Sequence, residues 1–290
     1  STDSTQAVLD SHKSGILRVI QGQELKKGWR GKPNACHQLA KAATGDILAF
    51  TDADTIWNPN ATQQIVQAMQ QNNADALSVW SEQILSTTLG KILQPFMAWS
   101  LVGLLPMGLA RDSRYPAITS ANGQLFAYKK EVYWKFGGFE RVKDSILEDI
   151  EAAKLLKKEG YRYVLLNGVS SISCKMYDSS KEALDGFAKS NFAAIGYSPF
   201  GYIAASALFI WLHWMPFVWL LIAPSPILPF CTITLMYLSR ARSDLECKYP
   251  LALSLLAPVS VLAWVYVTGV SWYRYAVGKV TWKGRSYDLR

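Results

Sequence analysis

Two carboxylates, Asp52 and Asp54, are separated by one residue directly after a short apolar run at residues 47–50. Such a run is typical of a buried strand, and open α/β sheets bind ligands beyond the carboxyl ends of their strands. Two close carboxylates repel each other unless a cation lies between them. Mg²⁺ and Mn²⁺ prefer oxygen ligands and are commonly shared with substrate phosphates. The pattern predicts a metal–diphosphate site for a nucleotide-activated substrate, although Asp is also common in turns for backbone reasons alone.

A second acidic pair, Glu148 and Asp149, opens a stretch with helical spacing, because Ile146, Ile150 and Leu156 fall on one helix face. Acids at a helix N-terminus stabilise the helix dipole. A carboxylate within hydrogen-bond reach of a hydroxyl can also act as a general base. Taken alone the pair favours the first interpretation, and with the Asp-x-Asp motif upstream we favour the second.

The segments around these residues alternate between strand-like and helix-like patterns. Strands are predicted at residues 16–20, 47–50 and 76–80 and in the stretch that leads to Lys129, and helices at 5–13, 33–43, 59–72, 147 onward and 181–195. Strands that alternate with helices at this spacing are typical of an α/β fold with a largely parallel sheet.

Residues 89–110 are apolar and aromatic but interrupted by Pro95 and Pro106. Two predictions stay open for this segment. It is either a helix that lies at a membrane surface or lines the entrance for an acceptor, or a helix packed on the sheet.

The composition changes near residue 200. Residues 201–238 contain no Asp, Glu, Lys or Arg, and residues 251–270 form a second apolar run. A bilayer-spanning helix needs ~20 such residues, so we predict that the C-terminal third is embedded in a membrane, with a buried core helix as the alternative.

The net charge of +8 is concentrated around these apolar runs. From residue 200 onward, eight Lys or Arg stand against three Asp or Glu, and anionic lipid headgroups attract positive charge placed there. Nucleic-acid binding is excluded, because no arginine-rich face with interleaved aromatic residues is present. The four cysteines have no regular spacing, which indicates free thiols in a reducing compartment.

Five short blocks occur in order along the chain. They are Ser-Thr-Asp-Ser-Thr at 1–5, Gly-Lys-Pro-Asn-Ala at 31–35, Thr-Gly-Asp at 44–46, Thr-Asp-Ala-Asp at 51–54 and Glu-Asp at 148–149. Over residues 1–195 this order resembles family 2 glycosyltransferases with the GT-A fold. The resemblance implies a Rossmann-like, mostly parallel mixed sheet in a catalytic domain at 1–199, followed by transmembrane helices. The family's first strand would precede Ser1, so it also implies an N-terminally incomplete chain.

The resemblance implies a metal-dependent hexosyltransferase that uses a UDP- or GDP-sugar donor. Asp54 would bind the Mg²⁺ or Mn²⁺ that bridges the diphosphate, and Asp52 would bind the ribose or assist the metal. Lys32 would lie against the nucleotide, with a solvated loop lysine as the alternative. Gln124 is a candidate contact for the acceptor, with a turn amide bonded to the backbone as the alternative.

In the same resemblance Asp149 would be the general base that takes the proton of the acceptor hydroxyl, and Glu148 would orient Asp149 or the acceptor. One carboxylate base without a partnered nucleophile implies direct displacement. We therefore expect inversion, in which an α-linked donor gives a β-glycoside.

The apolar C-terminal part resembles the lipid-directed branch of the family, whose members glycosylate ceramides, carotenoids or hopanoids. Residues 183–192 lack the Gln/Arg-x-x-Arg-Trp motif of polysaccharide synthases and ceramide glucosyltransferases. We therefore expect non-processive transfer to a lipid hydroxyl such as that of a carotenoid or hopanoid. A membrane polysaccharide synthase and a catalytically inactive GT-A membrane scaffold are the alternatives.

Nucleotide sugars are cytoplasmic, so the catalytic domain is expected on the cytoplasmic side of the inner membrane. The Lys/Arg bias places the basic tail at 274–290 on the same side, which requires an even number of crossings within residues 200–273. The apolar pieces are three, at 201–222, 224–238 and 251–273. A multi-pass region of two or three helices is predicted, and a re-entrant middle piece would reduce the crossings to two.

Overall fold

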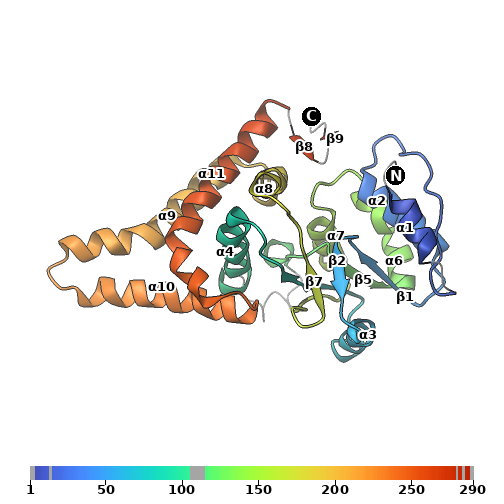
Figure 1. Ribbon diagram of the computed structural model, residues 1–290, viewed down its shortest axis with the longest axis horizontal. Helices are drawn as coiled ribbons and strands as arrows, with labels where there is room; N and C mark the ends of the chain where they lie inside the picture. Colours follow the sequence, from blue (N-terminus) through green and yellow to red (C-terminus); the bar gives the residue numbers. More distant parts are fainter. Residues whose placement is uncertain (1–3, 13–14, 105–114, 279, 283–284, 288–290) are drawn as a thin grey trace.

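The computed structural model describes residues 4–12, 15–104, 115–278, 280–282 and 285–287. Figure 1 shows two parts side by side, an α/β part that contains the larger sheets and a helical part built from α4 and α8 to α11. The predicted site residues all belong to the α/β part. The mixed α/β class expected from the sequence is confirmed.

The main sheet is mixed and has four strands in the order β1-β5-β3-β6. β1 (Ile47–Thr51), β3 (Ala76–Trp80) and β6 (Tyr163–Asn167) run in one direction, and β5 (Leu125–Lys129) runs against them. Two of the three pairings are therefore antiparallel. The prediction of a mostly parallel sheet is wrong for the pairings, although three of the four strands share a direction.

The position at which β5 begins explains this difference. Its first residue, Leu125, pairs with Thr51, the last residue of β1. β5 thus starts at the carboxyl ends of β1 and β3 and must run back along them. As a result, the residues just before β5 lie beside the Asp-x-Asp turn, and the backbone N–H of Asp52 donates to the carbonyl oxygen of Gln124 at 3.4 Å.

Hydrophobic cores lie on both faces of this sheet. On β5, Phe126 and Tyr128 belong to one core, and Leu125 and Ala127 belong to the other, as the alternation of strand side chains requires. The helices that cover the first core are α2 (Gly31–Ala42), α6 (Lys130–Phe136) and α7 (Glu148–Lys158), and the helix on the second is α3 (Ala61–Gln71).

The strand predicted at residues 16–20 is wrong. This segment has no regular structure between α1 (Thr5–Ser11) and α2, and Ile16 is 97% exposed. A strand forms only where a neighbour supplies hydrogen bonds to its backbone, and among the described strands none pairs with this segment. The predicted helices are confirmed as α1, α2, α3, α7 and α8 (Ser180–Ala194).

A smaller sheet fixes the far side of the Asp-x-Asp turn. Its order is β2-β7-β4, with bounds Thr55–Trp57 for β2, Ile172–Cys174 for β7 and Glu82–Gln83 for β4. Thr55 pairs with Cys174, so the turn that carries Asp54 is held between the main sheet and this smaller one.

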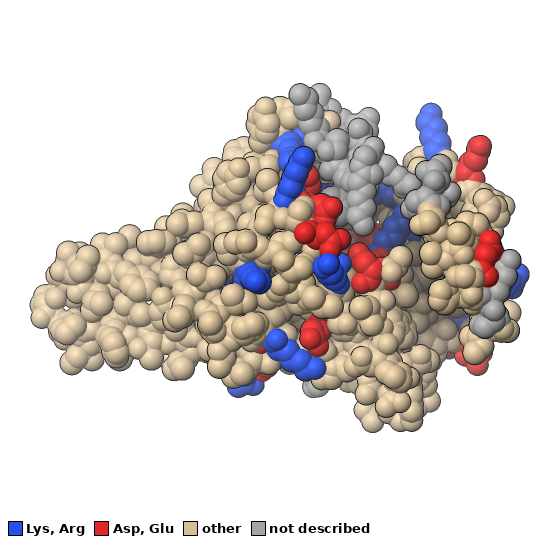
Figure 2. Space-filling model, viewed as in Figure 1, with Lys and Arg blue, Asp and Glu red and all other residues tan. Residues whose placement is uncertain are grey.

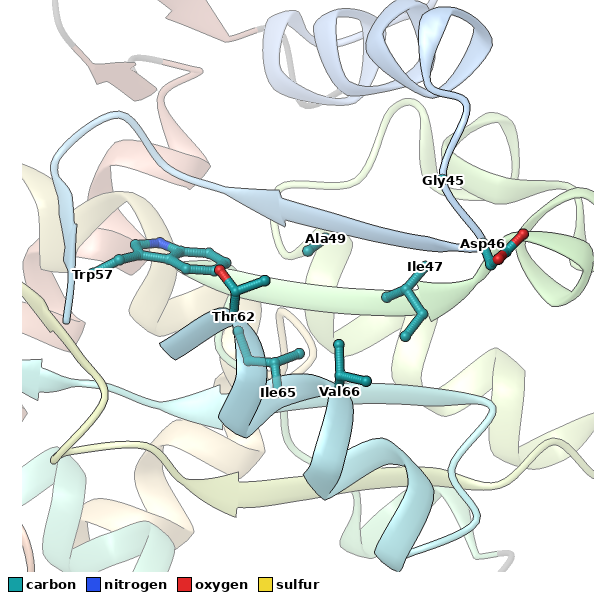
Figure 3. Close-up of a pocket in the computed structure, with 8 residues that line it drawn as sticks. All are labelled: Gly45, Asp46, Ile47, Ala49, Trp57, Thr62, Ile65 and Val66. Carbon is teal, nitrogen blue, oxygen red and sulfur yellow. The ribbon is translucent and has the colours of Figure 1, made fainter. Parts of the chain in front are cut away.

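An apolar pocket of about 310 Å³ lies between β1 and α3. Figure 3 shows Trp57 at one end of its lining. Its lining includes Ile47, Ala49, Ile65 and Val66. None of the predicted site residues lines it. The pocket therefore does not belong to the candidate site.

The segment at 89–104 is the buried centre of the helical part. It forms most of α4 (Thr88–Leu104), in which Leu93, Phe96 and Ala98 are almost fully buried. α4 packs against α8, α10 and α11, and its Phe96 ring contacts Phe209 of α9. Its main partners are thus helices rather than the sheet, and the membrane-surface helix or acceptor entrance stays a prediction. Residues 105–110 lie outside the described residues.

α9 (Pro199–Ile222) and α10 (Ile227–Glu246) form a hairpin that projects away from the α/β part (Figure 1). The projecting end carries no Lys, Arg, Asp or Glu on the face shown in Figure 2. The exposed side chains of the hairpin include Trp211, Leu221, Ile227 and Phe230. Large exposed apolar surfaces of this kind mark sites of interaction with proteins or membranes.

Two helical segments of the described chain are long and apolar enough to cross a membrane, Pro199–Ile222 and Leu251–Ala276. In an apolar stretch of 18 residues within each, 11% of the first and 44% of the second is buried. The second combines a 3-10 turn with α11 (Ala257–Ala276), which packs against α4, α8 and α9. It is followed by the strand pair β8 (Val280–Trp282) and β9 (Arg285–Tyr287).

Candidate functional site

Lys32 joins the two predicted acidic motifs. Its Nζ lies 2.7 Å from Oδ1 of Asp52 and 3.1 Å from Oε1 of Glu148. It also donates to the carbonyl oxygen of Gly123 at 3.1 Å. The start of α2, the end of β1, the residues before β5 and the start of α7 therefore meet at one ammonium group.

The charge of Lys32 is strongly favoured. Burial alone would lower its pKa, but the carboxylates of Glu148, Asp52 and Asp149 outweigh this effect and raise the pKa above its ordinary value. An ammonium group has three N–H donors. Asp52, Glu148 and the Gly123 carbonyl match that number, so Lys32 holds the site together rather than offering donors to a ligand.

Asp149 is placed beside this group at the start of α7. Its Oδ1 accepts from the backbone N–H of Ile150 at 2.8 Å. Burial and the adjacent charge of Glu148 raise the pKa of Asp149 to about 6, and Lys32 opposes that rise. A carboxylate with a raised pKa is a stronger base than an ordinary Asp, which suits a proton acceptor.

Gly123 lies directly beside the side chains of Lys32 and Asp149. A Cβ at this position would be 2.8 Å from Nζ of Lys32 and 3.2 Å from Oδ2 of Asp149. Both separations are shorter than ordinary contacts with a Cβ. The absence of a side chain at this residue therefore keeps the centre compact.

Asp52 and Asp54 have different surroundings. Asp52 is half-buried and paired with Lys32. Burial raises its pKa, and Lys32 opposes the rise. Asp54 is exposed, and its Oδ1 accepts from the thiol of Cys174 at 3.6 Å.

Within the described residues, no group of three or more His, Cys, Asp or Glu side chains is arranged to hold a metal ion. The donor set at the turn nevertheless fits Mg²⁺ or Mn²⁺ shared with a ligand, because Asp54 offers an exposed carboxylate and phosphate oxygens would complete the coordination. Asp52 is the weaker candidate ligand, since one of its oxygens is bonded to Lys32.

Gln124 lies in a buried polar network and is only 6% exposed. Its Oε1 accepts from Nε2 of Gln83 at 2.7 Å and from the hydroxyl of Ser81. Its backbone oxygen accepts from Thr51 Oγ1 at 3.0 Å. The side-chain amide of Gln124 thus bonds to other side chains, whereas the alternative expected a bond to the backbone. The acceptor contact stays a prediction.

The structure brings the side chains of Lys32, Asp52 and Glu148 together with Asp149 beside them. A further charged residue, Lys189, carried no predicted role. This residue on α8 is half-buried, and the charges that act on it include those of Glu148, Lys32 and Asp52. In the sequence, Lys189 stands out only as a basic residue within 183–192, the stretch that lacks the Arg-Trp motif.

Comparison with known proteins agrees with the motifs in the first half of the chain. No curated protein matches the chain. The match to the family model ends before Glu148 and Asp149, and Lys32 inside the matched region contacts Glu148 at 3.1 Å. Residues 1–137 match the family model described as Glycosyl transferase family 2, and this match supports glycosyltransferase activity.

Proposed function

We propose that this protein transfers a sugar from a UDP- or GDP-sugar to the hydroxyl of a membrane lipid, with inversion at the anomeric carbon. The observation that carries the proposal is the single centre in which Lys32 contacts both Asp52 and Glu148. It puts a candidate base, Asp149, close to the turn that would hold the donor diphosphate.

Asp149 acts as the general base in this proposal. The lone pair of the acceptor oxygen forms the new bond to the anomeric carbon, and the hydroxyl proton passes to the Asp149 carboxylate. The bond between the anomeric carbon and the phosphate oxygen breaks, and its electrons leave with the nucleoside diphosphate. Glu148 supports the step through its charge, because that charge helps to raise the pKa of Asp149.

Asp54, with its exposed carboxylate, would hold a divalent cation together with the diphosphate oxygens. When bound, such a cation stabilises negative charge on a departing phosphate oxygen. Asp52 is fixed by Lys32 at one oxygen, and we assign it to the ribose or to a supporting position beside the cation.

A lipid acceptor is favoured by the α9–α10 hairpin. α9 has 24 residues, which at about 1.5 Å per residue gives about 36 Å, against a hydrocarbon core of about 30 Å. The apolar part of α10 at 227–239 is shorter, about 20 Å. It ends at Arg240 and Asp244, which form a buried ion pair of 3.1 Å.

The two ends of the hairpin return to the same side of the molecule (Figure 1). At the base of α10, the backbone oxygen of Glu246 accepts from Asn167 of the α/β part at 3.1 Å. We infer that the hairpin enters the inner membrane from the cytoplasmic face and returns to it. This arrangement keeps the catalytic centre on the side where nucleotide sugars occur.

The test is a transfer assay with the full chain in membranes. Labelled UDP- and GDP-sugars are supplied with Mg²⁺ or Mn²⁺, and label is measured in the organic extract. Label in a lipid of β-configuration, read from the anomeric proton by NMR, supports the proposal. Failure of transfer from every donor would contradict it, retained configuration would refute inversion, and a labelled polymer would favour a synthase.

A further inference from the structure

A row of side-chain amides joins the helical part to the loop that precedes β5. Gln94 on α4 donates from Nε2 to Oε1 of Gln83 on β4 at 3.0 Å. Gln83 donates from its own Nε2 to Oε1 of Gln124 at 2.7 Å, and Nε2 of Gln124 donates back to Gln83 at 3.4 Å. This amide row, Gln94–Gln83–Gln124, therefore runs from a helix of the apolar part to the edge of the candidate site.

All three amides of the row are buried. A buried amide that loses its partner costs more free energy than an exposed one, because water does not replace the lost bond. Gln94 lies on an apolar stretch of α4, in which Leu93 and Phe96 are buried as well. A polar side chain at this position is accounted for by its bond to Gln83 rather than by apolar packing.

The loop that precedes β5 makes two backbone contacts on which the centre depends. The carbonyl oxygen of Gly123 accepts from Nζ of Lys32 at 3.1 Å. The next carbonyl oxygen, that of Gln124, accepts from Oγ1 of Thr51 at 3.0 Å and from the backbone N–H of Asp52 at 3.4 Å. The position of this loop therefore sets how closely the ammonium group of Lys32 approaches the Asp-x-Asp turn.

The loop is anchored on each side of Gly123. Before it, Oγ of Ser78 lies 2.9 Å from both the backbone nitrogen and the carbonyl oxygen of Asn122. After it, the side chain of Gln124 is held by the amide row and by the hydroxyl of Ser81. Gly123 has no side chain of its own, so the carbonyl oxygen that accepts from the lysine is positioned through these two neighbours.

α4 gives the amide row a firm support. In Figure 1 this helix lies on the side of the helical part that faces the sheets. Two residues after Gln94, the ring of Phe96 contacts those of Phe209 on α9 and Trp264 on α11. Packing on both sides keeps the amide of Gln94 in a fixed place against Gln83, and buried polar networks with satisfied members rigidify their surroundings.

We propose that Gln94 is a positioning residue for sugar transfer, which acts through Gln83 and Gln124 on the loop that holds Lys32. This inference rests on the proposed function. It gives the helical part a role in the reaction besides contact with lipid, because α4 then helps to set the distance between the base region and the donor turn.

The test is a double-mutant cycle in the full chain. Gln94→Met and Gln83→Met keep the length of the side chain and remove the amide, and both are compared with the double variant. Sugar transfer is measured in membranes. Folded sites are counted by calorimetric titration of the detergent-solubilised protein with UDP or GDP and Mg²⁺. The quantities compared are kcat per nucleotide-binding site and the KM for the donor.

Gln94→Met should lower kcat per site by about 10-fold and change the donor KM by less than about 2-fold, because a small displacement of the base region acts on the transition state. If Gln94 acts through Gln83, the double variant is no slower than Gln83→Met alone. Gln94→Asn, whose amide is one methylene shorter, should change kcat in the same direction, and it serves as the second variant if Gln94→Met does not fold.

Asn191→Leu is the matched control in the helical part. The buried amide of Asn191 donates to Oγ1 of Thr268 at 3.2 Å and joins α8 to α11. Its loss should lower the thermal stability and leave kcat per site unchanged, which is the result expected of a merely structural amide.

A wild-type kcat per site in Gln94→Met and Gln94→Asn would overturn the role of Gln94 and leave the proposed function intact. The same conclusion follows if the effects of Gln94→Met and Gln83→Met on kcat are independent of each other. No transfer by the wild type from any nucleotide sugar would instead contradict the proposed function.

Discussion

Nζ of Lys32 lies 3.1 Å from Oε1 of Glu148, which brings the first turn of α2 against the first residue of α7. The same nitrogen lies 2.7 Å from Asp52 at the end of β1. One lysine thus connects the region that would hold the donor to the region that would hold the base.

The pH dependence of transfer should report the ionisation of Asp149. Its pKa is raised to about 6, first by burial and then by Glu148, and only its ionised form can accept a proton. We therefore expect kcat/KM to fall as the pH drops through about 6.

Glu148→Gln should move this acid limb to lower pH, because removal of the neighbouring negative charge lowers the pKa of Asp149. The control is Glu151→Gln, an exposed acid in the same first turn of α7, which should leave the limb in place. If the acid limb does not move in Glu148→Gln, the charge of Glu148 does not raise the pKa of the base that limits transfer.

Gly123→Ala should reduce transfer while the protein stays folded. The added Cβ would lie 2.8 Å from Nζ of Lys32, and this flexible end would have to move away from the carboxylates. A displacement of about 1 Å can reduce the rate by about 100-fold. Steady-state transfer rates and thermal unfolding curves provide the check.

Gly22→Ala is the matched control for this substitution, since the nearest atom to its Cβ is 4.0 Å away, in Gln38. Wild-type activity in Gly123→Ala would mean that the close approach of Lys32 and Asp149 is not needed for turnover.

The acidic motifs could be predicted from the sequence because they are local. Asp52 follows an apolar strand, and Glu148 opens a helix, so each residue carries its own signal. The contact of both with Lys32 depends on how three distant elements meet, and no single segment contains that information. The resemblance to the glycosyltransferase family indicated this contact in part, because it assigned Lys32, Asp52 and Glu148 to one site.

The errors have a common physical origin in long-range pairing. Residues 16–20 have a strand-like composition but no described strand beside them. β5 runs against its neighbours because it starts at the end of the sheet where β1 finishes. The burial of Phe96 on α4 likewise depends on α9 and α11, since its ring contacts those of Phe209 and Trp264.

Membrane insertion of the hairpin can be tested with a natural probe. Of the four cysteines, Cys231 on α10 is exposed, and Cys36, Cys174 and Cys247 are buried. In sealed membranes we expect a membrane-impermeant maleimide to leave Cys231 unlabelled, because this part of the hairpin would lie in the hydrocarbon region. Denaturation in detergent should then permit labelling.

A Cys231→Ser variant identifies the labelled position. Fast labelling of Cys231 in intact membranes, from either side, would place the hairpin in water and remove the main argument for a lipid acceptor.

The most direct measurement of the central claim compares Asp149→Asn with the wild type in two assays, sugar transfer and Mg²⁺-dependent binding of the nucleotide sugar. The substitution keeps the shape of the side chain and removes the proton acceptor, so transfer should fall to background while donor binding is retained. Transfer at the wild-type rate by Asp149→Asn would contradict the account, because the base would then have to be another group.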